Sequence, residues 1–164
     1  VDAIRKTLLA TPGVRGLHEL RTRRMAHQAL VDAHVLVDAR ISVSEGHRIA
    51  ESARAGVLRE HHDVLDVLVH IDPEDDLDPD LAAAGLPSRE ALLEELADLL
   101  VTLPTPEHVV LHYLGGRVEV EVFLAHDVFA DISALRSTEA ALAERIKDHP
   151  AIRSISLNFR IAPE

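Results

Sequence analysis

Hydrophobic residues recur along the chain with two spacings, and each spacing is typical of one element type. Apolar positions three and four residues apart indicate amphipathic helices, which we expect at residues 2–9, 42–60, 88–101 and 131–147. Alternating apolar and polar positions indicate half-buried strands, which we expect at residues 14–24, 30–39, 64–71, 109–114, 117–124 and 152–161. Ser42 and Glu45 fit a capping box, and Gly115-Gly116 indicates a two-residue hairpin turn.

The order of these elements is the same in both halves of the chain: helix, strand, strand, helix, strand. This order predicts an α+β fold of two tandem α-β-β-α-β modules, each a three-stranded sheet with its helices on one face. We expect the modules at residues 1–74 and 88–164, joined by an acidic, proline-containing linker at 75–87. The halves end alike, in Ile-Asp-Pro-Glu and Ile-Ala-Pro-Glu, which favours an internal duplication with a period of about ninety residues.

The composition narrows the classes of partner. A formal net charge of −11 argues against nucleic acid. The acidity is concentrated in residues 75–164, which hold seven basic and seventeen acidic residues, against ten and eleven in residues 1–74. There is no cysteine, so disulfides and thiolate metal sites are excluded. No apolar run reaches the roughly 18 residues of a membrane span. The chain begins with valine rather than methionine, which is compatible with a piece of a longer protein.

The strand at 64–71 ends in a histidine and a carboxylate that share one face. Side chains alternate along a strand, so Val69 and Ile71 point one way and His70 and Asp72 the other. A histidine and an aspartate placed in this way can form half of a divalent-metal site. Seen alone, such a pair is more often a solvated histidine and an acidic strand end, so the decision depends on the rest of the module.

Three further histidines extend this pair. His34 on the strand at 30–39 and His18 on the strand at 14–24 can share its face, which is the open face of the sheet, and His47 enters from the following helix. Four histidines and one aspartate suit Zn²⁺ or another first-row divalent ion. Asp72 is the only aspartate of the set that can bridge two ions. Each histidine taken singly is also explained as an ordinary surface residue.

Strict alternation also assigns the faces of the neighbouring strands. In the strand at 14–24 we expect one face to carry His18, Leu20 and Thr22 and the other to carry Leu17, Glu19 and Arg21. Leu36 and Leu68 fall on the same open face as His34 and His70. Apolar side chains beside such ligands predict that the face is covered by a second copy of itself or by the second module.

Four separated motifs of the first module resemble the cytoplasmic C-terminal domain of cation diffusion facilitator transporters. They read GLHELRTR at 16–23, DAHVLVD at 32–38, SVSEGH at 42–47 and VHIDP at 69–73. The resemblance covers about residues 1–74. Proteins of this family are dimeric exporters of zinc and related ions, whose membrane helices carry the ion against a proton gradient.

The resemblance implies a metallochaperone-like (ferredoxin-like) module that binds metal near a dimer interface, where metal draws two copies together and regulates transport. It also implies a transmembrane domain in the same longer protein. The family's five ligand positions are all filled in this chain, and the resemblance implies two ions per site with the aspartate as the bridge. These positions are His18, His34, His47, His70 and Asp72.

The second module departs from the family, whose members usually end after one. Aligned on the Pro-Glu ends and the strand pattern, the ligand positions Asp72, His70 and His34 fall on Ala162, Arg160 and about Glu121. This predicts a degenerate structural copy. It remains open whether the second module pairs with the first within the chain, with His112 as an added ligand, or whether the first modules of two chains pair as a homodimer.

Two functions compete at this stage. The favoured one is the cytoplasmic, metal-sensing regulatory domain of a divalent-cation, zinc-type efflux transporter, in which metal binding drives the association of modules. The alternative is a stand-alone soluble metal-binding or metallochaperone-like protein. We do not expect an enzyme, because the sequence has no nucleophile elbow, no His-Glu-x-x-His pair and no phosphate-binding loop.

Overall fold

The chain divides into two compact units, Val1–Asp78 and Pro79–Glu164, and each has a hydrophobic core of its own. The computed structural model describes residues 1–75, 85–125, 127–128 and 131–160. Most of the linker expected at 75–87, and the final Ile-Ala-Pro-Glu motif, therefore lie outside the described residues. Within the described ranges, no helix is both long enough and apolar enough to cross a membrane.

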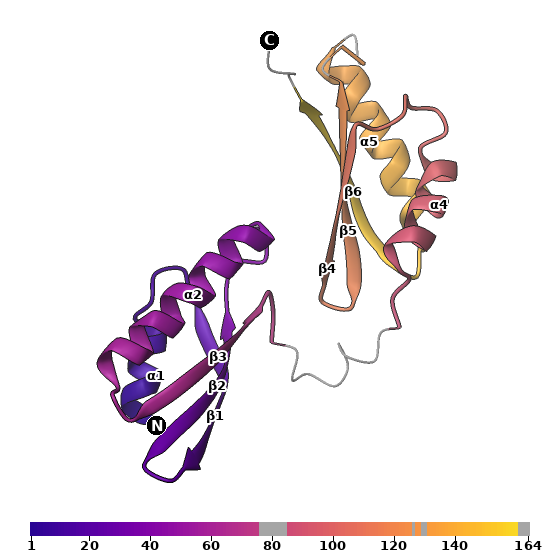
Figure 1. The fold of residues 1–164 in the computed structure, drawn as a ribbon. Helices are drawn as coiled ribbons and strands as arrows, with labels where there is room; N and C mark the ends of the chain where they lie inside the picture. The colour runs from indigo at the N-terminus through magenta and orange to yellow at the C-terminus, as the bar shows by residue number, and fades with distance from the viewer. Residues whose placement is uncertain (76–84, 126, 129–130, 161–164) are drawn as a thin grey trace. The chain divides into compact units, whose positions relative to one another are not determined.

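The first unit is a three-stranded mixed sheet with two helices on one face (Figure 1). Its elements follow in the expected order: α1 (Asp2–Leu9), β1 (Gly16–Met25), β2 (Gln28–Leu36), α2 (Val43–Glu60) and β3 (Val64–Asp72). The central strand β2 is antiparallel to β1 and parallel to β3. A parallel pair needs a crossover connection. Helix α2 makes this crossover and covers one face of the sheet, which leaves the other face open.

The core of the first unit lies between the sheet and the two helices, as the apolar pattern predicts. Val31 and Ala33 of β2 are at most 2% exposed and pack with Leu8 of α1 and Val57 of α2. Each of the buried valine and leucine side chains contributes roughly 1.5–3 kcal/mol relative to an exposed one. The residues that alternate with them along β2 are turned to the open face of the sheet.

Local polar contacts fix the position of helix α2. The Ser42 hydroxyl accepts a hydrogen bond of 3.1 Å from the backbone N–H of Glu45, which confirms the predicted cap. Further along the helix, Arg54 donates a hydrogen bond of 2.8 Å to Asp66 of β3. This contact, together with the backbone N–H of Val67, holds the pKa of the Asp66 carboxyl below its ordinary value.

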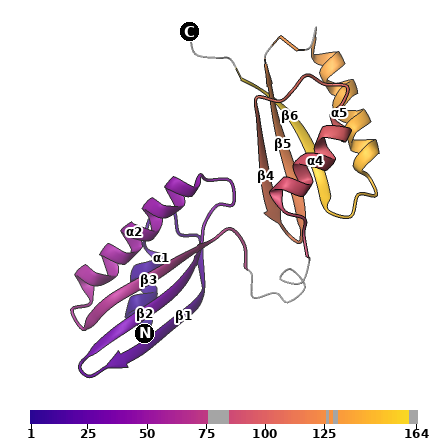
Figure 2. The same ribbon diagram turned by 45° about the vertical axis from the view of Figure 1, so that its right-hand side comes forward.

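The second unit repeats this architecture, as predicted. It consists of α4 (Arg89–Leu99), β4 (His108–Leu114), β5 (Arg117–Ala125), α5 (Ile132–Ile146) and β6 (Ile152–Arg160). The central strand β5 is antiparallel to β4 and parallel to β6. Both helices lie on the same face of the sheet (Figures 1 and 2). The side chains of Ser88 and Asp131 cap the N-termini of these helices by accepting hydrogen bonds from the backbone N–H groups of Ala91 and Ala134.

The two sheets share the details of their register. In each, the hairpin closes around two residues, Ala26-His27 in the first unit and Gly115-Gly116 in the second. Gly115 and Gly116 have φ angles of 57° and 67°, which glycine adopts readily and which suit a tight hairpin. Near the hairpin end of each sheet, the third strand contains one extra residue that the pairing with the central strand skips. This residue is Leu65 in β3 and Arg153 in β6. The same skip in both units supports the proposal of a duplication.

This shared register corrects part of the sequence-based match between the two units. When the two sheets are aligned on their hairpins and skipped residues, Phe123 rather than Glu121 is the residue equivalent to His34. Asn158 rather than Arg160 stands at the place of His70. The sequence-based match is displaced by two residues because neither the Pro-Glu ends nor the strand pattern, which repeats every two residues, fixes the register relative to the turns. The imidazoles of the first unit have no histidine counterpart at these two positions.

Separate cores predict separate responses to core mutations. Leu124→Ala removes a fully buried side chain from the second unit and should destabilise that unit by about 2–5 kcal/mol. Hydrogen–deuterium exchange measured by mass spectrometry should show faster exchange in β4–β6 and unchanged exchange in β1–β3. The reciprocal variant Leu8→Ala should affect only β1–β3. Faster exchange in both sheets of either variant would contradict two separate cores.

Candidate metal centre

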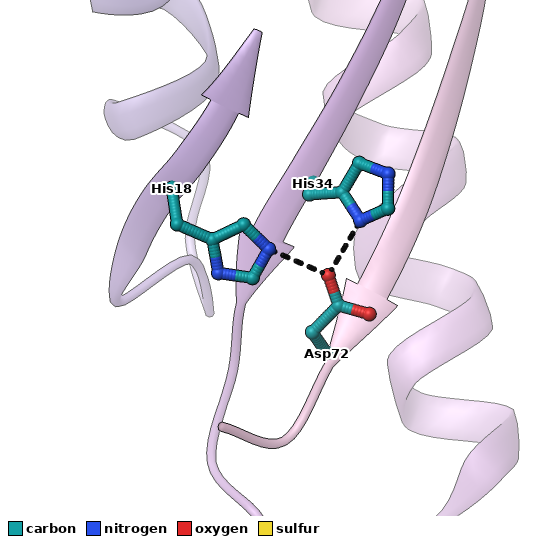
Figure 3. Close-up of side chains that lie close together, drawn as sticks. All are labelled: His18, His34 and Asp72. Carbon is teal, nitrogen blue, oxygen red and sulfur yellow. Dashed lines mark hydrogen bonds and ion pairs between the residues drawn. The ribbon is translucent and has the colours of Figure 1, made fainter. Parts of the chain in front are cut away.

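Three polar side chains, one from each strand of the first sheet, converge on the open face of that sheet. They are His18 of β1, His34 of β2 and Asp72 at the end of β3 (Figure 3). Asp72 Oδ2 lies 3.0 Å from His18 Nε2 and 2.9 Å from His34 Nδ1. One potential ligand atom from each residue lies within 4.8 Å of the other two.

The parallel register of β2 and β3 accounts for two of these three positions. His34 is paired with His70, and Leu36 with Asp72. Because side chains alternate along a strand, Asp72 is on the same face as His70, opposite the core-facing Val69. The carboxylate at the end of β3 therefore lies next to the His34 ring, as predicted from the sequence.

The third position depends on a β-bulge in β1. Between Leu17 and Glu19, β1 advances by two residues while β2 advances by one, from Val35 to His34, so His18 is the extra residue. Bulges of this kind redirect side chains and are frequent near functional sites. The bulge places both His18 and Glu19 on the open side of the sheet.

Strict alternation along β1 is therefore wrong. We expected Leu17 and Leu20 on opposite faces, but both pack against the core of the first unit. A regular strand cannot turn two leucines three residues apart to the same face, because its side chains alternate between the two faces. This spacing is the sequence signal that would have revealed the bulge and placed Glu19 beside His34.

The cluster is largely shielded from solvent. The side chains of His18, Asp72 and His34 are 5%, 15% and 26% exposed. Buried imidazoles and carboxylates need polar partners. Here the Asp72 carboxylate makes a hydrogen bond with the His34 ring and lies 3.0 Å from His18 Nε2. In the hydrogen bond with His34 Nδ1, the carboxylate oxygen accepts and the ring nitrogen donates its proton.

Each histidine also has a second carboxylate on its other ring nitrogen. Glu19 Oε2 lies 3.6 Å from His34 Nε2, and Asp75 Oδ1 lies 3.5 Å from His18 Nδ1. Neither carboxylate was predicted from the sequence as part of the site. Glu19 was missed because of the bulge, and Asp75 because it belongs to an acidic stretch that was interpreted as linker.

The remaining two predicted residues lie outside this cluster. The His70 ring stacks on the His34 ring, with centroids 4.2 Å apart and planes at 13°, so it flanks the cluster on the same face. His47 instead lines a groove with Val69 and Ile71, whose side chains point to the helix layer. The expectation that His47 joins the others within one chain is wrong in geometry, because α2 covers the opposite face. Its role as a ligand remains a prediction.

The donor set fits a first-row divalent ion. Zn²⁺ is bound by imidazole nitrogens and carboxylate oxygens at about 2.0–2.2 Å, which separates neighbouring ligand atoms of a tetrahedral site by about 3.3 Å. The separations of 3.0 Å and 2.9 Å around Asp72 Oδ2 are only slightly shorter. The two distances to Asp72 Oδ2 therefore need to widen by only a few tenths of an ångström for an ion to be held between these atoms, and a nitrogen of one histidine lies within 4.8 Å of a nitrogen of the other.

Comparison with known proteins gives matches to the first unit. Residues 1–74 match the family described as "Cation efflux protein, cytoplasmic domain". Metal tolerance protein C1 of Arabidopsis thaliana is 40% identical over 73 residues, which are 44% of this chain and 16% of that protein. Cation-efflux pump FieF of Pectobacterium atrosepticum is 34% identical over 71 residues, 43% of this chain and 23% of that protein.

The chain thus spans less than a quarter of the length of these two relatives. Among solved structures, a MamM CTD in its manganese form is 27% identical, with a TM-score of 0.44 over 44% of this chain and 92% of that one. The first unit, which is less than half of the chain, is thus similar in sequence to the family described as the cytoplasmic domain of cation efflux proteins.

Proposed function

We propose that the first unit is the regulatory, metal-sensing domain of a divalent-cation efflux transporter, and that it binds its regulatory ion at His18, His34 and Asp72. The observation that supports this most is the single Asp72 oxygen shared by two imidazoles at 3.0 Å and 2.9 Å. The match of residues 1–74 to a cation efflux domain supports the role. The relatives named for metal tolerance and cation efflux support the class of cargo.

Zn²⁺ is the ion that we propose for this site. Two imidazoles and one carboxylate form a borderline ligand set that zinc accepts in tetrahedral geometry. The ring nitrogens that would hold the ion carry no proton when it binds: a neutral imidazole then has its one proton on the other ring nitrogen, and a protonated imidazole releases one proton. The ion also joins the beginning of β1 to the end of β3 across β2. Metal occupancy is in this way coupled to the stability of the open face.

His70 and His47 belong to the proposed full site as ligands of a second ion that Asp72 bridges. His70 needs only to leave its stacked position on His34 to turn a ring nitrogen toward Asp72. His47 is on the helix side of the sheet, so it can contribute only to the cluster of another copy of the domain. A second ion therefore requires association of two copies, which links metal binding to a homodimer.

The open face itself supports association. Leu68 of β3 is 56% exposed and lies on the same side of the sheet as His70 and Asp72. Leu36, which is paired with Asp72, also belongs to this face. Apolar side chains next to a polar cluster are typical of surfaces that bind a partner. We propose that the partner is a second copy of the first unit and that the second unit is a structural companion without ligands of its own.

Replacement of the shared carboxylate tests the site and the association together. In Asp72→Ala both imidazoles lose their common partner, and Zn²⁺ binding measured by calorimetry should weaken by more than the ~10–100-fold typical of outer-shell partners. Sedimentation velocity should show zinc-dependent association of the wild-type chain and none for this variant. Asp63→Ala, an exposed acidic residue of the same unit, is the control. Unchanged zinc stoichiometry and affinity in Asp72→Ala would rule out the proposed site.

Zinc affinity should also depend on pH in a defined direction. Imidazole binds metal only when it is deprotonated, so protons compete increasingly as the pH falls through the ordinary histidine range near about 6.5. Competition titrations with a zinc chelator from about pH 8 to about pH 5.5 should show steadily weaker binding as the solution becomes more acidic. An affinity that does not change over this range would contradict ligation by histidines.

A further inference from the structure

Both histidines of the metal centre lie between two carboxylates. Asp72 faces one ring nitrogen of each, and a second carboxylate faces the other nitrogen: Glu19 for His34 and Asp75 for His18. A histidine that binds a metal through one nitrogen nearly always donates the N–H of the other to a carboxylate, a carbonyl or water. The two outer carboxylates lie on the side of each ring that this rule requires, at 3.6 Å and 3.5 Å, so a small side-chain movement would bring each to hydrogen-bond length.

Glu19 is the better held of the two outer carboxylates. It is the residue paired with His34 across the sheet, directly after the bulge. Its side chain is 23% exposed, and its Oε1 lies 2.5 Å from a guanidinium nitrogen of Arg21. Its second oxygen, Oε2, faces His34 Nε2 at 3.6 Å. The Arg21 guanidinium, whose side chain is 74% exposed, thus contacts one oxygen of the carboxylate while the other oxygen faces the ring. Asp75, by contrast, is 59% exposed.

We propose that Glu19 is a positioning residue that orients His34 for metal binding, with Asp75 in a weaker, equivalent role for His18. By accepting the proton of Nε2, Glu19 keeps Nδ1 of His34 directed toward Asp72 and available to the ion. Its negative charge also makes the imidazole a stronger donor. This inference rests on the proposed function, because it assumes that the ion binds at Asp72.

Glu19 lies on the outer side of the His34 ring. This position distinguishes it from a ligand of the ion. The Nε2 atom that it faces is the nitrogen of His34 that points away from the Asp72 oxygen, since Nδ1 makes the 2.9 Å contact. A carboxylate on this outer side acts on the ion through the imidazole. The loss of Glu19 should therefore weaken zinc binding without removing an ion from the site.

The experiment measures Zn²⁺ affinity and stoichiometry for the full 164-residue chain by competition with a chromogenic chelator. Glu19→Ala should bind zinc about 10–100-fold more weakly with unchanged stoichiometry. Glu19→Gln should lose less, because its amide oxygen still accepts the ring proton. Asp75→Ala should also lose less than Glu19→Ala. The control is Glu51→Ala, an exposed carboxylate on α2, which should bind as the wild type does.

A second readout separates positioning from folding. In the zinc-loaded, ¹⁵N-labelled wild type, the Nε2 proton of His34 should give an observable signal protected from water. That signal should be lost in Glu19→Ala and retained in Glu51→Ala, while far-ultraviolet circular dichroism of the metal-free proteins stays the same.

Three outcomes would overturn the proposal, and they are distinguishable. If the wild type does not bind zinc, the proposed function fails and this inference fails with it. If the wild type binds and Glu19→Ala is within about twofold of it, the site stands and the positioning role is wrong. If Glu19→Ala loses one zinc ion per chain while the Nε2 proton of His34 is retained, Glu19 is a direct ligand rather than a positioning residue.

Discussion

One carboxylate oxygen, Asp72 Oδ2, joins the three strands of the first sheet at one point. It lies 3.0 Å from an imidazole of β1 and 2.9 Å from an imidazole of β2, and it belongs to the last residue of β3. Two histidines held around a largely buried carboxylate are a stable polar cluster without metal, and the same atoms suit a divalent ion. We propose that an ion binds at this point in competition with protons, which would give the domain a chemical means of sensing metal.

The second unit shows that the fold does not require this site. It has the same element order, the same two-residue hairpin and the same skipped residue in its third strand. Its first strand, however, pairs with β5 only as far as His108, which stands at the place of Glu19, so no paired residue corresponds to His18. Phe123 occupies the place of His34. The α-β-β-α-β frame is thus a scaffold, and the candidate metal centre depends on a bulge and a few side chains added to it.

Sequence patterns predicted the frame and the three side chains that converge on the open face, but not the outer carboxylates or the position of His47. Alternation in β2 and β3 placed His34, His70 and Asp72 correctly, because both strands are regular there and each has one apolar face. It failed in β1, where the need to bury both Leu17 and Leu20 forces an extra residue into the strand. The sequence analysis also misplaced His47. Helix α2 packs on the apolar face of the sheet, so a histidine that it carries lies on the helix side of the sheet and not on the open face.

The most direct test of the metal centre is the position of the ion itself. Crystals of the zinc-loaded chain, measured at the zinc absorption edge, should give an anomalous peak about 2.0–2.2 Å from His18 Nε2, His34 Nδ1 and an Asp72 oxygen. Zinc bound elsewhere on the chain, with these three side chains arranged as they are without metal, would contradict the assignment.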